Sequence, residues 1–159
     1  ETLRYLGMTL IFLAALAFSR SLTLRGRRRL SEGEGYRDLL LFMKEEMTSY
    51  ARPVNVWCRE FSSPALEENG FLPALRERSD LSSAYGAAGR VGEEEDACLS
   101  ALFSSFGRAT RTEAIASLSA AIATLSPLLE KRREETLRSE RVVRTLCASF
   151  ALVTVILLL

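Results

Sequence analysis

The chain has 159 residues, enough for one domain with a modest core. Its net charge of +1 argues against a strong nucleic-acid binder, and the absence of histidine removes the commonest general base, the usual catalytic triads and nearly all zinc sites. The cysteines Cys58, Cys98 and Cys147 form no CxxC pair, so we expect no disulfide framework and a reducing compartment.

Apolar residues gather at both ends of the chain. The stretch YLGMTLIFLAALAFS lies between Arg4 and Arg20, and a run of similar length closes the sequence from Thr145 to Leu159. Each would form a helix of roughly 22 Å, slightly short of a bilayer span, and snorkelling arginines could make up the difference. We predict transmembrane helices over residues 1–19 and 141–159. A cleaved signal peptide is the alternative for the first, because Ala15-Leu16-Ala17 offers a cleavage site.

Arginines lie on the inner flank of both apolar segments. They are Arg25, Arg27, Arg28 and Arg29 after the first segment, and Arg141 and Arg144 before the second. Because such clusters mark the cytoplasmic side of a membrane, we predict a cytoplasmic middle domain behind a basic juxtamembrane linker over residues 20–34. The cluster at residues 25–29 is also compatible with binding an anionic lipid headgroup.

The middle of the chain has the periodicity of helices. From 36 to 52 one helical face holds Tyr36, Leu39, Leu40, Met43, Met47 and Tyr50. Pro53 can open a second helix over residues 53–61, and short helices follow over 65–69 and 72–78. The stretch SSAYGAAGRVG (82–92) is expected to be rich in turns because of its three glycines.

An acidic run, Glu93, Glu94, Glu95 and Asp96, opens the next predicted helix, which Gly107 is suited to end. Acidic residues complement the dipole at a helix N-terminus. The sharper alternative is a docking patch for a basic partner. We regard these four residues, with the arginines Arg108 and Arg111 near the Gly107 turn, as candidate partner contacts.

The last helix is predicted to be the longest. Thr110-Arg-Thr-Glu113 has the capping-box pattern, and Ile115, Leu118, Ile122, Leu125 and Leu129 form an apolar seam. The seam would pack inside the domain, which needs that core, or against another copy. Pro127 should kink this helix without ending it, and the helix is expected to run into the membrane. The predicted fold is all-α, with a helical bundle domain over residues 35–140 flanked by an N-terminal and a C-terminal transmembrane helix.

No motif in the sequence supports catalysis. The P-loop pattern is absent, and adjacent carboxylate pairs such as Glu45-Glu46 diverge around a helix. We therefore expect no enzyme, cofactor, metal or small-molecule substrate. A membrane enzyme would require a pocket with convergent carboxylates of shifted pKa.

The order of these features resembles the stage III sporulation protein AB family. EEMTSYARPV (45–54) is similar to the family's E-x-x-Y-G-x-T-P-L stretch, and LFSSFGRATRTEA (102–114) to its L-G-x-[ST]-D motif. A basic linker and a terminal ILLL complete the pattern. The chain departs from it at Ala51, Arg52 and Thr112, where the family usually has glycine, threonine and aspartate.

The resemblance implies a non-enzymatic membrane component of the channel between mother cell and forespore. Its soluble part is similar to the cytoplasmic domain of type II secretion and type IV pilus platform proteins. Implied partners are the membrane, a secretion-type ATPase of the stage III sporulation protein AA type and other proteins of that complex, but no nucleic acid. The alternative function is a lipid-binding or membrane-organising protein that uses the arginine cluster.

Overall fold

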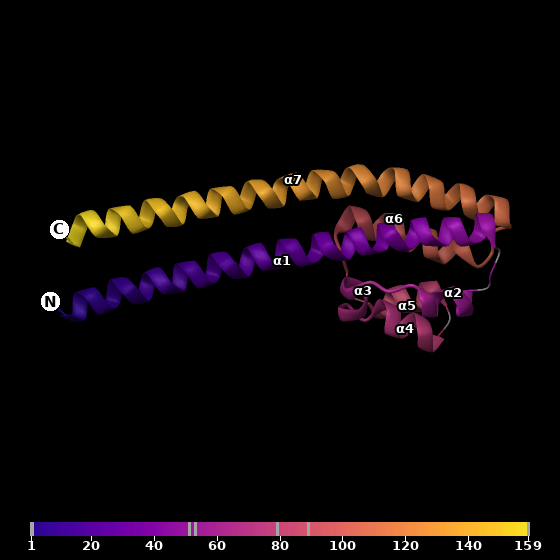
Figure 1. Ribbon diagram of the computed structural model, residues 1–159, viewed down its shortest axis with the longest axis horizontal. Helices are drawn as coiled ribbons and strands as arrows, with labels where there is room; N and C mark the ends of the chain where they lie inside the picture. Colours follow the sequence, from indigo (N-terminus) through magenta and orange to yellow (C-terminus); the bar gives the residue numbers. More distant parts are fainter. Residues whose placement is uncertain (1, 51, 53, 79, 89, 159) are drawn as a thin grey trace. The chain divides into compact units, whose positions relative to one another are not determined.

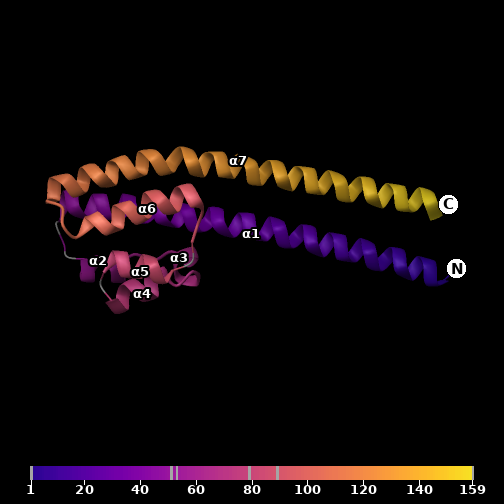
Figure 2. The same cartoon turned by 180° about the vertical axis from the view of Figure 1, so that it is seen from behind.

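The computed structural model describes residues 2–50, 52, 54–78, 80–88 and 90–158. Within these residues the regular structure is entirely helical, with no β-strand, which confirms the all-α prediction. The helices are drawn in Figures 1 and 2 and are α1 (Thr2–Ser49), α2 (Val54–Glu60), α3 (Pro64–Glu68), α4 (Phe71–Arg78), α5 (Leu81–Ala87), α6 (Glu93–Phe106) and α7 (Arg111–Leu158).

Helices α2, α3, α4 and α6 lie close to where the sequence places them. Helix α6 ends at Phe106, and Gly107 follows it with an ordinary right-handed φ of −73°. Pro53, expected to open the second helix, lies outside the described residues. Tyr50 ends the apolar face that the sequence predicts, but it lies just beyond α1, which ends at Ser49, and it is 67% exposed.

The turn-rich prediction for residues 82–92 is wrong in its first half, which forms helix α5. Asp80 caps this helix, since its carboxylate accepts a hydrogen bond of 2.8 Å from the backbone N–H of Ser83. Leu81 and Ala84 are buried on its inner face. Burial and the cap together outweigh the poor helix propensity of Gly86.

Contacts divide the chain into two units. The terminal unit comprises Glu1–Arg27 and Arg132–Leu159, and the central unit comprises Arg28–Lys131. Helices α1 and α7 contribute to both units, so residues 20–34, predicted as a linker, continue the same helix as the apolar segment before them. Helix α7 continues through Pro127, as predicted.

In the terminal unit, α1 and α7 lie side by side (Figures 1 and 2). A Cβ built at Gly26 would be 3.7 Å from Thr136 Cγ2, and the Arg27 guanidinium is ion-paired with the Glu140 carboxylate. Most side chains of residues 2–19 and 151–158 lie outside the described part of the structure. The two transmembrane segments therefore stay predictions.

Among the described residues, one helical stretch, Arg111–Cys147, is long and apolar enough to cross a membrane. Its first half buries Leu118, Leu125 and Leu129 in the core of the central unit. The core helix of a helical domain satisfies the same criterion of length and composition. This finding therefore supports membrane association only weakly, and it also indicates that the apolar seam packs within the domain.

The core of the central unit is built around Tyr36 of α1, which is fully buried. Its ring centroid is 5.1 Å from that of Phe71 in α4, 5.5 Å from Tyr85 in α5 and 6.4 Å from Phe103 in α6. The Tyr36 hydroxyl accepts a hydrogen bond of 3.3 Å from the Asn69 side-chain amide. One side chain thus joins four helices and the turn after α3.

Two glycines in α1 allow neighbouring helices to approach closely. A Cβ at Gly33 would overlap the Cδ2 of the buried Leu129 in α7. A Cβ at Gly35 would lie 2.9 Å from Ser63 Oγ and 3.1 Å from Leu66 Cγ, at the start of α3. Glycine lowers helix propensity by about 1 kcal/mol relative to alanine. Here the close packing of the neighbouring side chains, which only glycine permits, offsets that cost.

The N-terminus of α7 carries the predicted capping box. The Glu113 carboxylate accepts hydrogen bonds of 2.8 Å from both the backbone N–H and the hydroxyl of Thr110. In return the Glu113 backbone N–H donates to Thr110 Oγ1 at 3.4 Å. The hydrogen bonds from Thr110 lower the pKa of Glu113 below its usual range. The four-residue pattern therefore sets where the long helix begins.

Replacing Gly35 with alanine should destabilise the central unit, because overpacking a core costs about 1–3 kcal/mol and only about 1 kcal/mol returns as helix propensity. Gly86 is the matched control, since a Cβ there meets no atom within 4 Å. Gly86→Ala should be neutral or stabilising. Denaturant unfolding of the detergent-solubilised chain, followed by fluorescence of the buried Trp57, measures both. Equal effects would contradict the close approach at Gly35.

Candidate partner-docking site

The acidic run at the start of α6 divides into exposed and internal carboxylates. Glu93 and Glu94 are exposed, whereas Glu95 is 1% exposed and Asp96 is half-buried. Successive helical residues point in different directions, so four adjacent carboxylates cannot share one surface. Only Glu93 and Glu94 present their charge to solvent as a docking patch requires.

Asp96 organises the segment between α5 and α6. Its Oδ1 accepts hydrogen bonds from the Tyr85 hydroxyl at 2.5 Å and from the Val91 backbone N–H at 3.2 Å, and its Oδ2 lies 3.8 Å from Arg90 Nε. Burial of Tyr85 and its hydrogen bond to Asp96 raise the pKa of this tyrosine. Asp96 is therefore engaged inside the central unit and is not a free acidic contact.

A hollow opens beside this segment. Its walls come from α1, from α5 and the connection after it, and from the first two turns of α6. The lining residues are Arg29, Tyr85, Gly86, Ala88, Arg90, Val91, Gly92, Glu93, Asp96, Ala97 and Ser100. The hollow thus brings together three residues singled out in the sequence: Glu93 and Asp96 of the acidic run, and Arg29, which is predicted to flank the membrane.

The predicted contacts Arg108 and Arg111 lie beyond the other end of α6. This helix has 14 residues, so about 20 Å separates them from the acidic turn. The exposed Arg111 donates hydrogen bonds to the backbone carbonyls of Met47 at 2.7 Å and Thr48 at 3.1 Å. It thereby satisfies carbonyls at the C-terminus of α1. The candidate contacts therefore form two separate surfaces.

The predicted membrane-flanking arginines are all exposed, and some already have partners. Arg27 pairs with Glu140, which lowers the pKa of that carboxyl, and Arg28 pairs with the buried Glu32 at 3.1 Å. Arg25, Arg29, Arg141 and Arg144 are exposed as well. The cluster at residues 25–29 is therefore only partly available to lipid headgroups.

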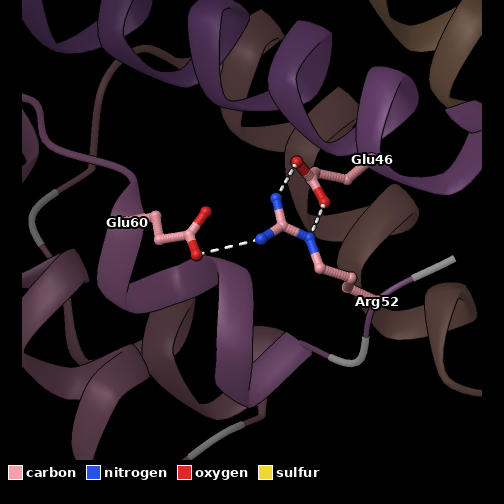
Figure 3. A network of polar contacts seen from close by, with 3 residues as sticks. All are labelled: Glu46, Arg52 and Glu60. Carbon is pink, nitrogen blue, oxygen red and sulfur yellow. Dashed lines mark hydrogen bonds and ion pairs between the residues drawn. The ribbon is translucent and has the colours of Figure 1, made fainter. Parts of the chain in front are cut away.

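Sequence reasoning missed an ion-pair network at the turn between α1 and α2. Arg52 donates to the two oxygens of Glu46 at 2.7 and 2.5 Å and to Glu60 at 2.9 Å. Figure 3 shows its guanidinium between the two carboxylates. The Glu46 side chain is 5% exposed, and its hydrogen bonds raise the pKa of Arg52. The sequence signalled this residue only as a departure from the family pattern.

All three cysteines are free. Cys58 is buried, and Cys98 and Cys147 are half-buried. Burial raises the pKa of the Cys98 thiol, which lowers its reactivity. Cys58, which is buried in the core of the central unit, packs there as a small apolar residue.

The fold and the site define an all-helical protein in which two 48-residue helices hold a domain completed by shorter helices. Residues 4–159 match the family described as stage III sporulation protein AB. The chain belongs to this family of sporulation proteins, which confirms the resemblance seen in its motifs. Comparison with curated proteins and with solved structures gave no match.

Replacing Arg52 with alanine should lower the free energy of unfolding by more than Glu60→Ala does, because it leaves Glu46 buried without its counter-charge. We expect less than for a fully buried pair, since the Arg52 side chain is 34% exposed. Glu60 is 52% exposed, so Glu60→Ala should cost at most about 1 kcal/mol. Denaturant unfolding measures both. A loss of stability for Arg52→Ala no larger than that for Glu60→Ala would contradict a stabilising role for the pair of Arg52 with Glu46.

Proposed function

We propose that this chain is a non-enzymatic, membrane-anchored platform in a sporulation channel or secretion-like complex. One observation carries the proposal. Each of α1 and α7 is a single 48-residue helix that carries an uncharged apolar stretch at its terminal end, over residues 5–19 and 145–158, and contributes its other end to the packed central unit. A helical domain joined to two apolar helices without an irregular linker suits a protein that holds a partner at a membrane.

The partner we propose is a cytosolic secretion-type ATPase of the stage III sporulation protein AA type, together with sister membrane proteins. Exposed charges on the central unit support a docking role. Glu93 and Glu94 project from the first turn of α6, and Arg108 projects from the turn at its other end. Exposed charges of this kind steer association and set its specificity.

The proposed location is a cell membrane, with the central unit in the cytoplasm. Arginines flanking both apolar segments support it, since positive charge is retained on the cytoplasmic side. A lipid-binding role for the cluster at residues 25–29 has less support, because Arg27 and Arg28 already pair with carboxylates.

Labelling of a surface cysteine tests the location. The exposed Ser82 of α5 is changed to cysteine in full-length chain whose Cys58, Cys98 and Cys147 are replaced by serine. A membrane-impermeant maleimide should react only after the cells are opened. Labelling in intact cells would place the central unit outside the cytoplasm and exclude a cytosolic ATPase as its partner.

Charge reversal tests the docking surface. Glu93→Lys with Glu94→Lys should reduce co-isolation of the ATPase with the full-length chain by about tenfold, equivalent to about 1.4 kcal/mol of binding. Glu134→Lys with Glu135→Lys is the matched control, since these adjacent glutamates of α7 are also exposed. Equal losses in both variants would mean that net charge, and not the α6 turn, determines binding. Unchanged co-isolation in both would remove this turn from the interface.

A further inference from the structure

The hollow beside α6 borders the predicted acidic patch at Glu93 and Asp96, but most of its lining lies outside that patch. It is an open hollow of about 670 Å³, within the range of sites that hold small ligands or a few residues of a peptide. Only residues of the central unit line it. Its ligand preference can therefore be argued from one folded body.

Two arginines from distant parts of the sequence line this hollow. Arg29 comes from α1, and Arg90 comes from the connection between α5 and α6. The side chain of Arg90 is 92% exposed, and its contact with Asp96, at 3.8 Å, is near the limit for an ion pair. Arginine forks recognise carboxylates through paired hydrogen bonds. The geometry therefore favours a ligand that carries a carboxylate.

The remaining wall favours a polypeptide backbone. Gly86, Ala88, Gly92 and Ala97 line the hollow, so no bulky side chain obstructs close approach there. Tyr85 is held in place through its hydrogen bond to Asp96. Because this side chain is already held in the free protein, ordering it on binding would cost little conformational entropy.

The carboxylates that line the hollow further restrict the class of ligand that it would bind. Exposed Glu93 and the Asp96 carboxylate both line the hollow. They would repel a ligand of high negative charge, such as a nucleic acid, more strongly than a single carboxylate. A single carboxylate near the arginines, with a basic side chain near Glu93, would complement both signs of charge.

We infer that the hollow binds an extended segment of a partner protein, with an acidic side chain held by Arg29 and Arg90 and a basic side chain beside Glu93. This inference rests on the proposed docking function. It differs in the charge of the main contact: arginines of this chain bind an acidic group of the partner, whereas the predicted acidic patch would bind a basic one. The partner segment would lie along the first two turns of α6.

Disulfide capture of peptides by the full-length chain tests this inference without requiring the ATPase. Ser100, an exposed residue lining the hollow, is changed to cysteine in the serine-replaced background described above. The detergent-solubilised protein is equilibrated in a thiol–disulfide buffer with cysteine-containing Gly-Ser peptides. These peptides carry one Glu and one Lys, one Gln and one Lys, or two Lys. Mass spectrometry then gives the ratio captured.

We expect the Glu peptide to be captured at least about threefold over the Gln peptide, equivalent to about 0.65 kcal/mol. Arg29→Gln with Arg90→Gln should remove this preference. Ser104→Cys, one turn further along α6 and not lining the hollow, is the control and should show no preference.

The inference is overturned by an absent preference, by a preference for two lysines, or by the same preference at Ser104→Cys. Competition by phosphatidylglycerol vesicles but not by phosphatidylcholine vesicles would assign the hollow to a lipid headgroup and overturn it as well. Capture reports on the hollow alone, and co-isolation reports on the ATPase. Failure of one measurement is thus distinguishable from failure of the other.

Discussion

The central unit depends on the burial of Tyr36. Its ring contacts Phe71, Tyr85 and Phe103, and its hydroxyl accepts a hydrogen bond from Asn69. Helices α4, α5 and α6 and the turn after α3 therefore all contact this one residue of α1. Helices as short as α3 and α5 are unstable in isolation and form because tertiary contacts hold them. Burial raises the pKa of Tyr36 far above its usual value, so the ring stays neutral at every physiological pH.

The same helix determines how closely its neighbours approach. Gly33 admits Leu129 of α7, and Gly35, on a different face, admits Ser63 and Leu66. The two glycines are separated by one residue, and on a helix that spacing directs them about 200° apart. The short sequence EGEGY (32–36) thus allows close contacts on two sides of α1 and contains the central tyrosine.

Several charged side chains of the central unit form ion pairs or hydrogen bonds within the unit and are therefore not available to a partner. Glu32 and Glu46 are buried on α1 and pair with Arg28 and Arg52, while Asp96 fixes the segment before α6. Removing either arginine leaves a buried carboxylate without its counter-charge, which is more damaging than losing an exposed pair. The charges left for partners are therefore fewer than the composition indicates, and they include Glu93, Glu94, Arg90 and Arg108.

Local periodicity, helix caps and motif order were enough to predict the all-helical class, the positions of α2, α3, α4 and α6, the capping box at Thr110 and the family. Packing between distant segments, in contrast, makes residues 81–87 helical, engages Asp96 internally, lets Arg111 cap α1 and places Arg29 and Arg90 in the lining of one hollow. Residues 29 and 90 belong to segments with no pattern in common, and their place in one lining depends on how α1 packs against the connection from α5 to α6. Local propensity carries no information on such contacts, since burial and long-range packing select the partners.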